Sequence, residues 1–291
     1  MNSPRVAPPP DVYASCPSDG KILGYYEGQF ESVYVLVHPF LRLKKRSADA
    51  AKTVDFANRK SVAENCESVS WSEVISLTGL PSISAVDIGL RTTIRALRKE
   101  FCNEDYAKKI FMLEETYGIY GPSEGYFSDL LHNTVMQFFQ DNGYQWAWVG
   151  DEFCTERKLY WIDDLKSKHA DAKLGHCSVF TPDKLILYTT HWDSHFSFLC
   201  APRKIIRRIV DSGDFEGFAC TADTQVYWST QVNRESLLQG EHCPPPFSLR
   251  SAENVLTRGC RNCPQRAITL LRRTTKAPII CSRLRKRSVI R

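Results

Sequence analysis

The spacing of apolar positions predicts helices in the first half of the chain. Ser70 and Glu73 fit a capping box and Gly79 fits a C-terminal stop, so a helix is expected over 71–78. From Ile83 to Phe101, apolar residues recur every three or four positions, which predicts one stripe of an amphipathic helix. Its other face, expected to be solvated, carries Arg91, Arg95, Arg98 and Lys99.

Two further helix starts follow this stripe. Asn103 can cap a helix that ends at Tyr117 before Gly118, and Ser123 can cap another that reaches Asp141. A later helix is expected to begin at Pro202 and to run to Val210. Helices therefore precede most of the predicted sheet.

An early strand is predicted over 32–43, with Pro39 at a bend or edge. The charged, weakly periodic stretch 44–68 that follows is interpreted as a surface excursion.

Strand patterns dominate the second half of the chain. From Tyr144 the period changes to two. The later strands are predicted over 144–149, 158–162, 177–181, 185–190, 196–200, 218–220 and 225–228.

Most of these strands are joined by turns too short for parallel crossovers. The pattern therefore predicts an α+β fold, with a mostly antiparallel sheet and three to four helices packed on one side of it. We expect a disordered leader over 1–21, a single domain over 22–229 and a basic, Arg-rich, disordered tail over 230–291.

Composition narrows the setting. No apolar run approaches the roughly 20 residues of a membrane-spanning helix, and prolines interrupt the N-terminus where a secretory signal needs an apolar segment. A cytoplasmic protein without a membrane partner is expected. The eleven cysteines are scattered and odd in number, which favours reduced thiols over a disulfide scaffold.

Charge is distributed unevenly. Residues 1–230 carry 25 Lys and Arg against 30 Asp and Glu, a net charge of −5, whereas residues 231–291 carry 13 against 3, a net charge of +10. From Asn254 to the end there are no acidic residues. The mildly acidic body suits a basic partner.

One candidate metal site stands out in the body. In an extended strand His191, Asp193 and His195 would share one face and could hold one cation. The alternative is a hairpin turn at residues 192–194, which would separate the two imidazoles. His176 is the additional ligand to consider if the first interpretation holds.

The tail offers a second metal candidate and three interpretations of its own. Cys260 and Cys263 form a CxxC that could bind zinc with His242, Cys243 or Cys281. The basic segment 254–291 could bind nucleic acid through phosphate contacts. It could equally be the product of an unselected reading frame, or an ordinary disordered tail.

Motifs of catalysis are absent from the sequence. It contains no GxSxG, GxGxxG or P-loop, which leaves no catalytic or cofactor-binding residue to name. An aromatic cluster could line a groove but is more typical of a core; its members are Tyr144, Trp146, Trp148, Tyr160 and Trp161.

Two stretches resemble known families. SWSEVISLTGL at 70–80, and the segment from strand 185–190 through HWDSHFSFLCAP to FEGFACTADTQVYW, are similar to bacterial domains of unknown function. The second also resembles the end of immunity-type proteins. This resemblance covers 22–229 and implies a bacterial, non-catalytic interaction module. A metal-dependent enzyme at His191, Asp193 and His195, and a nucleic-acid-associated protein acting through its tail, remain the alternatives.

Overall fold

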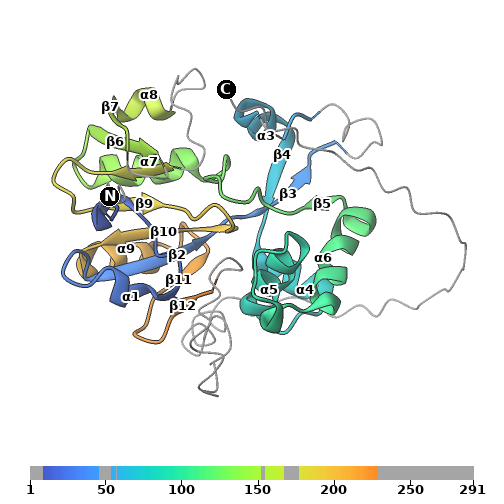
Figure 1. The fold of residues 1–291 in the computed structure, drawn as a ribbon. Coiled ribbons are helices and arrows are strands. Elements are labelled where there is room, and N and C mark those ends of the chain that lie inside the picture. Colours follow the sequence, from blue (N-terminus) through green and yellow to red (C-terminus); the bar gives the residue numbers. More distant parts are fainter. Residues whose placement is uncertain (1–8, 46–53, 57, 152–154, 167–176, 228–291) are drawn as a thin grey trace, which may run out of the picture. The chain divides into compact units, whose positions relative to one another are not determined.

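The main feature of the fold is a seven-stranded antiparallel sheet (Figure 1). The computed structural model describes residues 9–45, 54–56, 58–151, 155–166 and 177–227. The strands, in the spatial order β11-β2-β10-β9-β8-β6-β7, are β11 Gly217–Ala219, β2 Ser32–Val37, β10 Phe196–Ala201, β9 Leu187–Thr189, β8 Cys177–Phe180, β6 Trp146–Asp151 and β7 Arg157–Trp161. The predicted α+β class and antiparallel sheet are confirmed.

A smaller sheet continues from the large one at Pro39. The chain leaves β2, passes Pro39 and enters β3 (Phe40–Leu43), which pairs with β4 (Cys66–Val69) and β5 (Ile119–Tyr120). The interpretation of 44–68 as a surface excursion is therefore wrong at its end, where α3 (Arg59–Asn65) leads into β4. A third pair, β1 (Gly20–Lys21) and β12 (Gln225–Val226), brings distant parts of the chain together.

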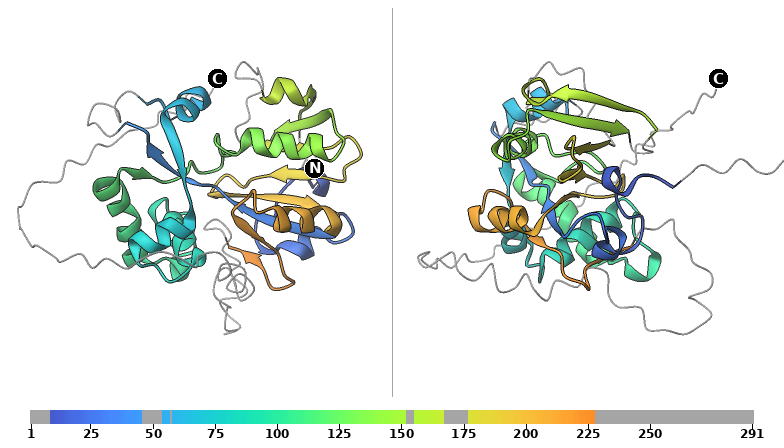
Figure 2. Two further views of the ribbon diagram at one scale, coloured as in Figure 1. Left: turned by 180° about the vertical axis from the view of Figure 1, so that it is seen from behind. Right: turned by 90° about the vertical axis from the view of Figure 1, so that its left-hand side faces the viewer.

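Helices cover both faces of the large sheet, which corrects the expectation of one side. Figure 2 shows α7 and α9 on one face, with η1 and α1 on the other. The remaining bounds are η1 Val12–Ala14, α1 Ile22–Tyr25, α4 Trp71–Thr78, α5 Ile83–Thr93, η2 Lys99–Phe101, α6 Glu104–Tyr117, α7 His132–Asp141, α8 Ile162–Lys166 and α9 Arg203–Ser212.

The two faces follow from the alternation within β2. Val33, Val35 and Val37 belong to the core that also contains residues of α4 and α5, whereas Tyr34 and Leu36 pack with residues of α7 and α9. Successive side chains of a strand point to opposite faces. An uninterrupted apolar strand such as β2 is therefore buried on both sides.

Helix α4 has the predicted start and end. The Ser70 hydroxyl accepts from the Glu73 amide at 3.0 Å, and Gly79 ends the helix at φ 63°. A distant carboxylate adds a second cap, because Glu216 accepts from the Trp71 amide at 2.7 Å and the Ser72 amide at 2.9 Å. These bonds satisfy amides that have no partner inside a helix.

Two helix predictions need correction. Helix α5 ends at Thr93 and Arg95 takes φ 60°, so the amphipathic stripe does not continue as helix to Phe101. Arg91 is fully buried, not solvated. Helix α7 begins at His132, nine residues after the predicted cap at Ser123, because the intervening loop packs against the turn at 191–195.

Part of the expected leader is folded. Within residues 9–21, η1 contacts β8, and Ala14 and Ser15 are buried. The five cysteines whose pairing state the structure gives, Cys16, Cys66, Cys102, Cys200 and Cys220, are free thiols. In the described parts of the chain no single helix has the length and apolar character of a membrane span; α4 and α5 reach it only when taken together across an 84° bend.

Candidate functional site

The HWDSH segment forms a turn between β9 and β10, and not an extended strand. The Ser194 amide donates to the His191 carbonyl at 3.0 Å, which closes a four-residue β-turn. The Ser194 hydroxyl lies 2.9 Å from the same carbonyl and 2.8 Å from the Phe196 carbonyl. Of the two geometries that the sequence left open, the turn is the one observed.

His191 is enclosed by its own turn. The Asp193 amide lies 3.1 Å from Nδ1, and the Trp192 indole N–H lies 2.9 Å from Nε2. A neutral imidazole has one acceptor nitrogen, so it accepts from one of these donors at a time. Burial, with Arg91 nearby, lowers the pKa of His191 to about 3, so the ring is neutral at physiological pH.

His195 faces away from this turn into the protein. Its Nδ1 lies 2.9 Å from the Pro122 carbonyl, which can only accept, so the proton of the neutral ring is on Nδ1. Nε2 is buried without a hydrogen-bond partner among the described residues. Burial lowers the pKa of His195 to about 4.

His38 lies beside His195. The His38 amide donates to the His195 carbonyl at 3.0 Å, and His38 Nε2 lies 2.7 Å from the Ser197 hydroxyl. A histidine this close to a serine is the arrangement that activates a nucleophile. Ser197 is 0% exposed, however, so no substrate reaches its oxygen in this conformation. Burial, with His195 nearby, lowers the pKa of His38 to about 3.

A buried ion pair lies next to the histidines. Arg91 and Asp87, one helical turn apart on α5, are joined by Nε and Nη2 contacts of 3.0 and 2.6 Å to Asp87 Oδ2. Arg91 Nη1 also donates to the Tyr227 carbonyl at 2.9 Å. The sequence pattern missed this pair because Arg91 falls off the apolar stripe of its helix. The carboxylate one turn earlier was the available signal.

Metal binding stays a prediction. Across the described ranges, no group of three or more His, Cys, Asp and Glu side chains is arranged to hold one metal ion. Asp193 is half-buried, and burial raises its pKa. His176, Cys260 and Cys263, like the basic segment 254–291, lie outside the described residues. Metal analysis of the purified protein and of His191→Ala and His195→Ala variants tests the site in the body.

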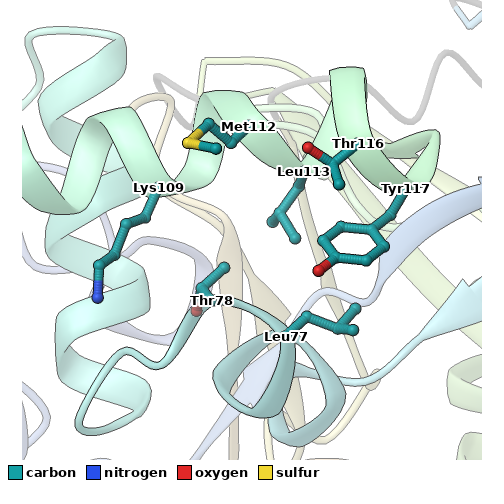
Figure 3. Close-up of a pocket in the computed structure, with 7 residues that line it drawn as sticks. All are labelled: Leu77, Thr78, Lys109, Met112, Leu113, Thr116 and Tyr117. Atoms are coloured by element: carbon teal, nitrogen blue, oxygen red, sulfur yellow. The ribbon is translucent and has the colours of Figure 1, made fainter. Parts of the chain in front are cut away.

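A groove between α4 and α6 offers a more accessible site. It has a volume of about 120 Å³ and is lined by Leu77 of α4 and, from α6, by Met112, Leu113 and Tyr117. Figure 3 shows Leu77, Leu113 and Tyr117 directed into the space between the helices. At one end, the Lys109 ammonium donates to the Gly79 carbonyl at 3.2 Å.

Two large apolar side chains are exposed on the otherwise charged outer surface of α6. Met112 is 58% exposed at the groove, and Phe111 is 64% exposed on the adjoining face. Acidic residues accompany them in the first and last turns of the helix: Glu104, Asp105, Glu114 and Glu115. This surface was not predicted from the sequence, although a signal was present. Four consecutive apolar residues, Ile110 to Leu113, are more than one buried stripe of a helix can contain.

The aromatic cluster around the β6–β7 hairpin is only partly core, because Tyr144 and Tyr160 pack against one buried cluster and Trp148 packs against the other. Trp146 is 45% exposed, and the other four aromatic residues are each only partly buried. Trp146 and Trp161 pack edge to face, with ring centroids 4.9 Å apart. The interpretation of these residues as core is therefore wrong for Trp146 and incomplete for the rest.

Comparison with known proteins identifies a family and a relative, neither of which has an assigned activity. Residues 18–230 match a family described as a protein of unknown function (DUF2711). The chain is 23% identical over 216 residues to the uncharacterized protein YwbB of Bacillus subtilis (strain 168), covering 72% of this chain and 95% of that protein. No solved structure matches.

Proposed function

Because the chain belongs to the DUF2711 family, whose members are described as proteins of unknown function, we propose its role from its own surface. It is a non-catalytic binding protein that takes a basic, amphipathic helix of a partner protein at the groove between α4 and α6. The observation that carries this proposal is the exposure of Phe111 and Met112 on one short stretch of α6.

The groove suits one anchoring side chain. Its volume of about 120 Å³ is well below the roughly 300 to 1,000 Å³ of small-molecule sites. Leu77 and Leu113 supply apolar walls, and Met112 supplies a flexible, polarizable rim that adapts to different anchors. An apolar residue of a partner helix inserted there would cover Met112 while neighbouring turns lie along α6.

The acidic last turn of α6 favours a basic partner. The two lysines of the helix have acceptors of their own, since Lys109 donates to the Gly79 carbonyl and Lys108 pairs with Asp105 at 3.3 Å. Glu114 and Glu115 occupy the last turn of the helix, where the macrodipole disfavours anions, and no basic residue accompanies them there. Both are exposed. Lysine or arginine side chains of a partner would attract these two carboxylates and offset their unfavourable interaction with the helix dipole, which stabilises the complex relative to the free protein.

The resemblance to immunity-type proteins supports a binding role of the same kind. Such a role needs a surface and no catalytic residue, in agreement with the burial of Ser197 beside His38. Bacterial origin and a cytoplasmic setting, where a basic partner would be met, are part of the proposal.

A synthetic amphipathic Leu–Lys helical peptide tests the groove. Its binding to the full chain, measured by fluorescence anisotropy, should be weakened by roughly tenfold or more in Met112→Lys, because the substitution places a like charge on the groove rim. Val210→Lys is the matched control, since Val210 is 40% exposed on α9 and should leave binding unchanged.

The design also separates specific docking from general attraction to an acidic protein. A Leu–Glu peptide of the same pattern should bind far more weakly than the Leu–Lys peptide. Equal binding of the Leu–Lys peptide by the chain and by Met112→Lys would overturn the assignment of the groove. Folding of each variant is checked by its thermal melt.

A further inference from the structure

Strand β7 is an outer strand of the seven-stranded sheet. Among the described residues β6 is its only strand partner, in the register Trp146↔Trp161 to Gly150↔Arg157. An edge strand presents unpaired N–H and C=O groups to any strand that can align with them. Proline and charged side chains often blunt such an edge. Strand β7 contains no proline, and its two charged residues, Arg157 and Lys158, both lie at its start.

The hydrogen bonds of the hairpin show which groups face outward. The Ile162 amide donates to the Gln145 carbonyl at 2.9 Å, and the Asp151 amide donates to the Glu156 carbonyl at 3.1 Å. Bonded and non-bonded pairs alternate along an antiparallel ladder, so Lys158 and Tyr160 bond to β6. The N–H and C=O groups of Arg157, Leu159 and Trp161 therefore point away from the sheet.

The side chains of β7 are complementary to those of the same strand turned by 180°. In antiparallel pairing of two copies centred on Leu159, each Leu159 lies opposite its own counterpart. Lys158 then faces Tyr160 of the other copy, and Arg157 lies opposite Trp161 of the other copy. The Arg157 guanidinium is already bonded to Asp11 and lies over the Tyr13 ring of its own chain, so Lys158 is the cation left to pair across the axis. A cation opposite an aromatic ring is an attractive cross-strand pair, and the register repeats it on both sides of the two-fold axis.

The same register satisfies the outward backbone groups. Each copy brings three residues that each donate and accept once across a hydrogen-bonded pair. An isologous contact needs one self-complementary patch, and this strand supplies it. Leu159, 39% exposed, lies on the axis, and Trp146, 45% exposed and opposite Trp161 on β6, extends the apolar part of the patch away from it.

We propose that this protein pairs with a second copy of itself through β7, in an antiparallel register centred on Leu159 that joins the two large sheets into one. The partner is a second copy because one strand carries the cation Lys158 on one side of Leu159 and the aromatic ring of Tyr160 on the other, with its outward backbone groups in self-complementary register. The inference does not depend on the groove between α4 and α6, which lies on other elements.

Sedimentation velocity over a concentration series of the full chain tests this pairing. The chain should be a reversible dimer, and Leu159→Lys should weaken the dimer by at least roughly tenfold, because two like charges then meet on the axis. Leu185→Lys is the matched control: Leu185 is 48% exposed, lies outside β7 and should leave the dimer intact. Thermal melts should show that both variants remain folded.

A charge-swap experiment fixes the register. Leu159→Glu alone should be monomeric like Leu159→Lys, but an equimolar mixture of the two variants should form a heterodimer, because only at the axis does residue 159 meet itself. A monomeric full chain at every concentration overturns the proposal. So does a dimer that Leu159→Lys leaves intact, or a mixture of the two variants that stays monomeric.

Discussion

Acidification from about pH 7 to about pH 5 should strongly destabilise this protein, because its core holds neutral histidines. His38, His132, His191 and His195 are all buried. Burial lowers the pKa to about 3 for His38 and His191 and to about 4 for His132 and His195, from an ordinary value of 6.5. The unfolded chain therefore binds more protons than the folded one between these values.

The sign and size follow from proton linkage. The stability that depends on the neutral histidines is fully present above the pKa of about 6.5 that a histidine has in the unfolded chain. It decreases as the pH falls toward the lower pKa values of the folded protein. At about pH 5, each histidine has lowered the free energy of unfolding by about 2 kcal/mol, since one pKa unit corresponds to about 1.4 kcal/mol. Four such residues together lower the free energy of unfolding by about 8 kcal/mol, which lies within the roughly 5 to 15 kcal/mol of total stability of a domain. Burial raises the pKa of Asp87 and Asp193. The folded protein therefore binds protons at these two carboxyl groups more readily than the unfolded chain, which offsets part of the lost stability at pH values where the carboxyl groups titrate.

Urea unfolding followed by tryptophan fluorescence at several pH values between about 7 and 5 measures the effect. The unfolding free energy should fall steeply over this range. In His132→Gln, where the amide can still donate to the Leu165 carbonyl bonded by His132 Nε2 at 2.8 Å, the slope should decrease by about a quarter. An unfolding free energy that is flat between these pH values would refute the assignment of four neutral buried histidines.

Three substitutions test the packing around the sites. Arg91→Met should destabilise the fold by about 3 to 5 kcal/mol, because Asp87 is left buried and uncompensated, and Asp87→Asn in the same chain should recover part of that loss in urea unfolding. Glu216→Gln should lower stability by about 1 kcal/mol through the weakened cap of α4, whereas exposed Asp214→Asn should not; equal melting temperatures would contradict this. Gly217→Ala should prevent native folding, measured by circular dichroism, because a Cβ there would lie 2.0 Å from the Val35 carbonyl oxygen.

Local signals were sufficient for much of the fold. The bounds of α4 follow from Ser70 and Gly79, which act within the helix itself. Helix α6 similarly follows from Asn103, whose side chain accepts from the Asp105 and Tyr106 amides, and from Gly118. The strands after residue 144 have period-two patterns and short turns, so the antiparallel sheet could also be inferred.

Other features depend on contacts that a single segment does not contain. Arg91 is buried because it bonds to Asp87 and to the carbonyl of Tyr227, which is 136 residues away. At HWDSH the sequence allowed a strand or a turn, and the choice depends on the Ser194 bonds and on the loop that bonds to His195. The groove arises only when α4 packs against α6.

The charge preference of α6 is the most direct test of the proposed function. Binding of the Leu–Lys and Leu–Glu peptides is compared between the full chain and a Glu114→Lys, Glu115→Lys variant. We expect the full chain to prefer the Leu–Lys peptide by at least roughly tenfold and the variant to prefer the Leu–Glu peptide. An unchanged preference for the Leu–Lys peptide in the variant would contradict the proposal.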